Sequence, residues 1–197
     1  MYRVIFFIGV LVLVGCGGTA NNSAIEVAGG FADAPPGAER IPYPNQDGLV
    51  KVILKGSDGL TLQEGDYRNG VRHGTWTEYH PTGLVRSISG YREGLLHGTH
   101  IAIDNRGNIA EKAVFANGVK NGKYLKYERG KIVQEMDYVN DVIHGTLKRY
   151  YSSGGIQEES TYANGVLDGD AIWYDQQGNV TIEYTYEKGQ LVNRGDS

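Results

Sequence analysis

The chain has few of the residues and motifs on which catalytic and metal sites depend. Of its 197 residues only Cys16 is a cysteine, which excludes an intramolecular disulfide and a CxxC metal site. GxSxG, HExxH and phosphate-loop motifs are absent, and with them the sequence signals of the common hydrolases and nucleotide-binding enzymes. Lysine and arginine form no cluster, and the net charge is −4, which argues against a nucleic-acid partner. We therefore expect no enzyme, no catalytic residue, no cofactor and no metal.

Glycine and tyrosine are abundant by contrast, with 29 and 14 residues. Glycine supplies the unusual backbone conformations of tight turns, and tyrosine is enriched in strands. Hydrophobic residues make up 40% of the chain and charged residues 21%, a balance typical of folded protein rather than disorder. These values predict an all-β fold with many short strands.

The first residues are typical of an export signal. Arg3 gives a short positive region, and an apolar stretch follows from Val4 to Val14. This stretch is too short to span a bilayer comfortably, so we expect a signal peptide over residues 1–15. It ends in Leu-Val-Gly-Cys at positions 13–16.

That ending resembles the lipobox of bacterial lipoproteins, in which an aliphatic residue, a tolerant position and a small residue precede the cysteine. The resemblance implies cleavage between Gly15 and Cys16, a lipid on the Cys16 sulfur and a fatty acyl group such as palmitate on the new amino terminus. Several acyl chains give durable membrane anchoring, at about 0.8 kcal/mol per buried CH₂. The alternative is an ordinary secretory signal in which the position of Cys16 is a coincidence.

The resemblance further implies an exported, lipid-anchored protein. Gly17 follows the cysteine where an aspartate resembles a signal for retention in the inner membrane, so the outer membrane is favoured for a Gram-negative host. Residues 16–46, which contain four of the five prolines, predict a flexible linker after the lipidated cysteine. We expect Ile41 and Tyr43 to dock onto the first strand and a repeat domain to occupy residues 47–197.

Internal repetition dominates the remainder of the sequence. The segment YRNGVRHGTWTEY begins at Tyr67, and its spacing of aromatic and glycine residues returns every 23 or 24 residues. Each repeat contains two turn signals, an Asn-Gly dipeptide or a close variant and a second segment ending in glycine, with alternating segments between them. The repeats therefore predict β-hairpins in a single continuous antiparallel meander of about twelve strands, from Leu49 to Val192.

The repeat resembles the bacterial variant of the MORN repeat, over residues 59–193, in five full copies and a partial sixth. Members of that family are often labelled antitoxin components of toxin–antitoxin systems, and MORN repeats elsewhere have been associated with phospholipid binding. The resemblance thus implies a protein partner, which would be a toxin, an effector or an envelope protein. It implies as an alternative a structural lipoprotein that contacts envelope phospholipid or cell wall.

Two aromatic columns recur through the repeats. We expect them to form ladders along one face and to supply most of a thin core, because a column filled in every repeat is first a packing requirement. An aromatic groove for a peptide, a glycan or a lipid tail is the alternative. The first column is Tyr67, Tyr91, Phe115, Tyr138, Tyr162 and Tyr186; the second is Tyr79, Ile103, Tyr127, Tyr150 and Tyr174.

Three further columns have the same period. The glycines at positions 74, 98, 122, 145 and 169 predict a bend in the strand. His73, His97 and His144 precede three of these glycines, and since equivalent residues lie about 9.5 Å apart, backbone hydrogen bonding is favoured over a shared metal ion. Glu64, Glu135, Glu159 and Glu183 form the last column. We expect it to be a solvated face or an acidic stripe for a basic partner, in preference to an acid–base pair.

Overall fold

The computed structural model describes residues 35–195, in which every regular element is a strand. The predicted signal peptide, Gly15, Cys16 and most of the predicted linker lie outside these residues. Within the described range there is also no helix long and apolar enough to cross a membrane.

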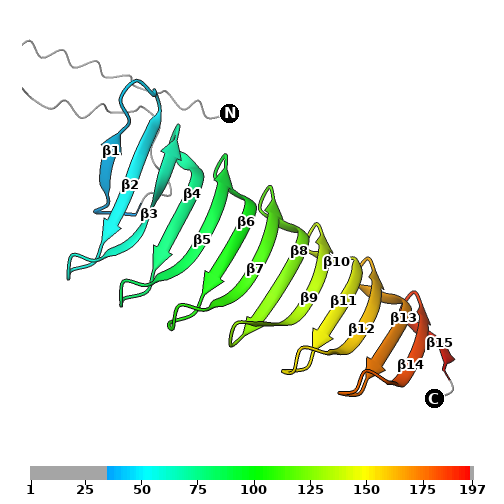
Figure 1. Ribbon diagram of the computed structural model, residues 1–197. Helices are drawn as coiled ribbons and strands as arrows, with labels where there is room; N and C mark the ends of the chain where they lie inside the picture. The colour runs from blue at the N-terminus through cyan, green and yellow to red at the C-terminus, as the bar shows by residue number, and fades with distance from the viewer. Residues whose placement is uncertain (1–34, 196–197) are drawn as a thin grey trace, which may run out of the picture.

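The strands form one antiparallel sheet in which each strand pairs with its neighbours in the chain (Figure 1). Their bounds are β1 (Glu39–Pro42), β2 (Leu49–Lys55), β3 (Thr61–Arg68), β4 (Val71–Tyr79), β5 (Val85–Arg92), β6 (Leu95–Ile103), β7 (Ile109–Ala116), β8 (Val119–Glu128), β9 (Lys131–Val139), β10 (Val142–Ile143), β11 (Gly145–Tyr150), β12 (Ile156–Ala163), β13 (Val166–Tyr174), β14 (Val180–Glu187) and β15 (Gln190–Arg194). Figure 1 shows the hairpins following one another in a single row, with their turns on two opposite rims. The predicted all-β meander is confirmed.

The sheet has 15 strands rather than about twelve. One addition is β1, which lies in the segment predicted to be a linker and pairs with β2. Pro42 is tolerated there because β1 is an edge strand and needs no N–H on its outer side. A second addition is β10, a two-residue segment that pairs with β9 and is separated from β11 by His144.

The first turn of each repeat adopts the predicted two-residue hairpin geometry. Both central residues have positive φ, as at Asn69 (52°) and Gly70 (82°), and even Asn140 and Asp141 keep it, with φ of 50° and 65°. Successive turns are joined by backbone hydrogen bonds, for example from the Gly118 N–H to the Leu96 carbonyl at 2.8 Å. One rim of the sheet is therefore a hydrogen-bonded series of turns.

The glycine column, where the sequence predicts a bend, marks a register shift in four repeats and the break between β10 and β11 in the fifth. Gly74 has a φ of 67° and Gly169 a φ of 121°, and the pairing register shifts beside Gly74, between Glu64 and Asp66 on β3. Each of these glycines lies opposite the leading aromatic of the next strand, as Gly74 does opposite Tyr91.

The two aromatic columns lie on opposite faces of the sheet, so the prediction of ladders along one face was wrong. The hairpin turn pairs Tyr67 with Arg72 on one side, and the strand alternation from Arg72 puts Tyr79 on the other. The Tyr79 hydroxyl accordingly donates to Glu64 at 2.7 Å, three positions before Tyr67. We call the side of the leading column (Tyr67 to Tyr186) face A and the side of the second column (Tyr79 to Tyr174) face B.

The core is a row of side chains along face A in which small and large residues alternate. Trp76 lies opposite Ser89, His100 opposite Ala113 and Leu147 opposite Ser160. Trp76 and Ala113 are each 1% exposed, although each strand contacts mainly its immediate neighbours. Burial in this sheet thus comes from side chains that cover one another along a face.

Candidate binding surface

Face A carries an aromatic cluster at its N-terminal end, built from β3, β4 and β5. The ring of Trp76 meets Tyr67 edge-on at 5.3 Å between centroids and Tyr91 at 6.4 Å. The Arg72 guanidinium lies 4.5 Å from the centroid of the Trp76 ring and 5.2 Å from that of Tyr91, and its Nη1 donates to the Tyr91 hydroxyl at 3.1 Å. Cation–π attraction and a hydrogen bond together fix this arginine over the rings.

The same arrangement returns two repeats later. Lys120 Nζ lies 5.1 Å from the centroid of the Tyr124 ring and 5.2 Å from that of Tyr138, and these two rings meet edge-on at 6.0 Å. Burial, together with a 3.0 Å hydrogen bond to the Glu111 carboxylate, raises the pKa of Tyr124 to about 12. A cation over paired aromatic rings is therefore a recurring feature of face A.

A third aromatic group lies at the C-terminal end of face A. The ring centroids of Trp173 and Tyr184 are 5.9 Å apart, and those of Tyr184 and Tyr186 are 6.4 Å apart. Arg194 in the last strand lies 6.0 Å from the Tyr184 centroid. Aromatic rings with neighbouring cations thus extend along face A from β3 to β15.

A polar row on face A, beside the aromatic residues, is formed by Arg149, Glu158 and Ser160. Arg149 Nη1 lies 2.5 Å from Glu158 Oε2, and Ser160 Oγ donates to the other Glu158 oxygen at 3.0 Å. Glu158 is 8% exposed, so its charge is held in the sheet by these two partners. The row therefore fixes the Arg149 side chain on this face.

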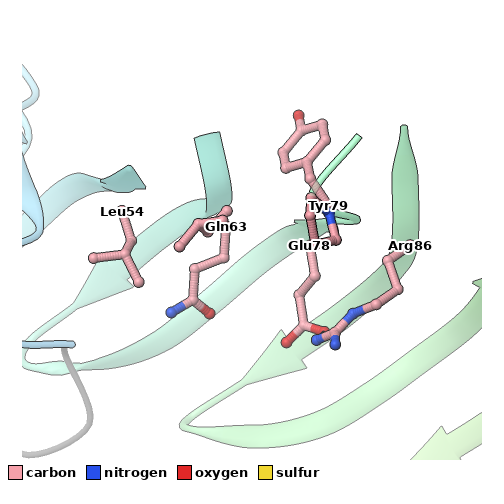
Figure 2. A pocket seen from close by; sticks show the side chains of 7 residues that line it. Leu54, Gln63, Glu78, Tyr79 and Arg86 are labelled. Carbon is pink, nitrogen blue, oxygen red and sulfur yellow. The ribbon is translucent and has the colours of Figure 1, made fainter. Parts of the chain in front are cut away.

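A shallow pocket lies near the N-terminal end of the sheet, between β2 and β5 (Figure 2). Figure 2 shows the Glu78 and Arg86 side chains together on one side of the strands and the Tyr79 ring on the other. Burial alone would raise the pKa of Glu78, but hydrogen bonds from Arg86, at 2.6 Å, and from Ser87 outweigh it and lower that pKa. The carboxylate is thus ionised and already paired. The pocket is lined by Leu54, Leu62, Gln63, Glu78, Tyr79, Pro81 and Arg86.

The glutamates that share a sequence column lie on face B and take part in cross-strand contacts. Glu64 accepts from Tyr79 and lies 3.0 Å from Lys51 Nζ; the hydrogen bond from Tyr79, followed by that from Lys51, lowers the pKa of Glu64. Glu159 lies 3.4 Å from Lys148. These carboxylates help to hold neighbouring strands together, and the structure does not bring them together as an acid–base pair.

The histidine column acts on the backbone of the following turn. His144 Nδ1 accepts from the Asn164 N–H at 3.4 Å, and Asp168 Oδ1, in the equivalent position, accepts from the Lys188 N–H at 3.1 Å. The predicted backbone hydrogen bonding is thus confirmed at His144, and Asp168 makes the same kind of bond. His97 Nδ1 is buried and has no partner among residues 35–195. The same range contains no group of three histidine, cysteine, aspartate or glutamate side chains arranged to hold a metal.

An exposed aliphatic stripe follows the rim formed by the first turns, on the side of face B. It consists of Val71, Leu95, Val142 and Val166, which are 37% to 50% exposed. Sequence reasoning missed this stripe, although the four residues share one position, directly after each two-residue turn. It also missed the cation–π clusters, because the paired rings come from different repeats.

Comparison with known families matches three segments of the chain to the MORN repeat variant, at residues 72–92, 143–164 and 167–188. Each segment begins at the residue that pairs with a leading aromatic and ends just beyond the next leading aromatic. Among curated proteins no sequence matches the chain. The three segments agree in phase with the structural repeat, and the chain thus carries MORN repeat variants at these positions.

Proposed function

We propose that this chain is a non-enzymatic binding scaffold that presents its repeat sheet to a protein in the bacterial envelope. MORN repeats are generally membrane-binding or protein-binding repeats. The observation that carries the proposal is the single-layer sheet, whose two faces are not covered by any other element among residues 35–195. Stacked repeats of this kind create a long binding surface without a deep pocket.

The lipobox-like ending at Cys16 supports a location at the membrane. The lipid on Cys16 would hold the sheet close to the bilayer, in the outer membrane of a Gram-negative host, and the linker would let it reorient. An exported, anchored protein meets its partner in the envelope, so an antitoxin-like role here would take the form of immunity against a toxin or an effector. This part of the proposal depends on the N-terminal sequence and on the resemblance to MORN-variant proteins.

Three measurements test the proposal. The mass of the purified exported protein should equal that of the chain from Cys16 onward plus its acyl groups, and Cys16→Ser should release the protein from the membrane. Chemical crosslinking in intact cells, followed by purification, should recover a partner protein in a fixed ratio. A sulfur without lipid would refute the anchor, and a protein that remains free of any stoichiometric partner would refute the scaffold.

The second candidate function is direct contact with phospholipid or cell wall. The exposed aliphatic stripe (Val71, Leu95, Val142 and Val166) favours it, because aliphatic side chains at a rim are suited to enter the edge of a bilayer. Flotation of the Cys16→Ser protein with vesicles separates the two functions. Retained flotation that a charged substitution such as Leu95→Glu abolishes would establish lipid contact. Complete loss of flotation would leave the anchor as the only attachment.

A further inference from the structure

We infer that face A is the docking surface and that it takes an acidic surface of a partner protein. The inference rests on the proposed scaffold function and adds to it the binding face and the chemistry of the partner.

Cations outnumber carboxylates on face A, although the whole chain has a net charge of −4. The strand register from β2 to β15 places on this face the cations Arg72, Lys120, Lys126, Lys131, Arg149 and Arg194 and the carboxylates Glu78, Glu111, Glu128 and Glu158. Arg86 joins the cations through its contact with Glu78. Face A is thus a positive surface on an acidic protein, and such a surface steers an oppositely charged partner toward one side.

Face B has the opposite balance. Its carboxylates on the same strands are Glu64, Asp66, Glu135, Asp137, Glu159, Asp168, Asp170, Glu183 and Glu187, whereas its cations are Lys51, Lys55, Arg68, Arg92, Lys112, Lys123 and Lys148. An acidic partner is therefore repelled by face B and attracted by face A, so the charge distribution selects both the partner and the face.

The residues beside the cations on face A are those that dominate binding energy in protein interfaces. Tryptophan, tyrosine and arginine are enriched at such positions, because they bury a large area and keep a polar group. Tyr91 and Arg72 form one such group above the buried Trp76 ring. Lys120 with Tyr124 and Tyr138 forms another. Most of these side chains are half-buried in the sheet, so they are held in place before a partner arrives, which lowers the entropy lost on binding.

The exposed aliphatic residues decide between a protein and an anionic bilayer. Binding to an anionic bilayer needs cations and exposed apolar side chains on the same side. Here the exposed aliphatic stripe lies on the side of face B, where Val71 pairs with Arg68 and Leu95 with Arg92. On face A the exposed aliphatic residues Ile182 and Leu191 lie only at the C-terminal end, in β14 and β15. The cations from β4 to β11 have no such stripe beside them, and face A therefore fits an acidic protein surface better than a lipid surface.

Two neighbouring residues of β6 provide a matched test in cells. Ala102 lies on face A and Ile101 on face B, and both are half-buried. Each is replaced in the full lipid-anchored chain by the photo-crosslinking residue p-benzoylphenylalanine. A protein crosslinked from Ala102 and not from Ile101 is expected. A protein crosslinked from Ile101 alone, or lipid crosslinked from Ala102, overturns the inference and leaves the scaffold function standing. No crosslinked protein from either position overturns both.

The crosslinked protein is then purified and titrated against two charge-reversed variants of the full chain. Lys120→Glu with Lys126→Glu changes face A, and Lys112→Glu with Lys123→Glu changes face B by the same charge. The face A variant should bind about tenfold more weakly or worse and lose part of the salt dependence, while the face B variant stays within about twofold. Equal effects of both variants, or an effect of the face B variant alone, overturn the inference. Lys120→Gln with Lys126→Gln replaces the first variant if it does not fold.

Discussion

The indole ring of Trp76 lies edge-on to the phenol ring of Tyr67, at 5.3 Å between centroids, and it occupies the space beside Gly65 where a side chain would lie. A Cβ added at Gly65 would come within 2.4 Å of Trp76 Cδ2. In a single-layer sheet no second layer can accept the displaced ring. The observed position of the Trp76 ring therefore requires a residue without a side chain at position 65.

Gly65→Ala should lower the free energy of unfolding by about 3 kcal/mol, because the new methyl group forces the Trp76 ring out of its place. Urea unfolding followed by circular dichroism measures the loss, and tryptophan fluorescence reports the movement of the ring. Gly155→Ala is the matched control, since its Cβ would meet no atom within 4 Å, and it should stay within about 0.5 kcal/mol. Equal effects of the two substitutions would show that Trp76 adapts freely.

The glycines of the bulge column should differ in their tolerance of alanine. Gly98 has a φ of +84° and open space around its Cβ position, so Gly98→Ala should cost about 1–2 kcal/mol for the left-handed conformation alone. Gly169 has a φ of +121°, and its Cβ would lie 3.0 Å from Thr161 Cβ. Gly169→Ala should therefore cost about 3 kcal/mol. Unfolding midpoints measure both losses, and a larger loss for Gly98→Ala would contradict this explanation.

Truncation of the leading aromatic column should have a graded effect. Tyr67 has no exposed area, so Tyr67→Ala should cost about 3–5 kcal/mol. Tyr138 is half-buried, and Tyr138→Ala should cost about 2 kcal/mol, because less apolar area returns to water. The free energy of unfolding checks both values, with Tyr138→Phe as the control that keeps the ring. A loss from Tyr138→Ala as large as that from Tyr67→Ala would contradict the gradient.

The sequence was sufficient to predict the hairpin repeat, because a period of about two dozen residues with Asn-Gly turns has few structural solutions. The assignment of the second aromatic column to a face failed, although the information was present. The two-residue turn at Asn69-Gly70 pairs Tyr67 with Arg72, and counting along the strand from Arg72 would have placed Tyr79 on face B.

The difference in charge between the two faces also follows from counting along the strands, and the sequence analysis missed it because that count was not made.

Other features depend on three-dimensional neighbours. The position of Arg72 over Trp76 and Tyr91 joins residues from different repeats, and β1 forms because β2 offers it an edge, despite a linker-like composition. The position of Arg72 has no local sequence signal. For β1 the sequence indicated only that Ile41 would dock onto the first strand, where it pairs with Lys51.

Tyr124 should make the stability of the sheet depend on alkaline pH. Its pKa is raised to about 12, mainly by burial and then by Glu111, whereas an unfolded tyrosine has a pKa of about 10. The unfolded chain therefore loses this proton first, and the stabilisation that is complete below about pH 10 is lost as the pH rises toward 12. The free energy of unfolding should fall over this range by a smaller amount in Tyr124→Phe than in the parent chain.

Glu111→Gln separates the two causes of the raised pKa. It removes the negative charge beside the Tyr124 hydroxyl but leaves the ring buried, so the pKa of Tyr124 should fall toward 10 and remain above it. Ultraviolet absorbance of the ionised phenol follows the titration, and the difference between the parent chain and Tyr124→Phe isolates this residue from the other tyrosines. A pKa that falls fully to about 10 in Glu111→Gln would show that the carboxylate, rather than burial, is the main cause.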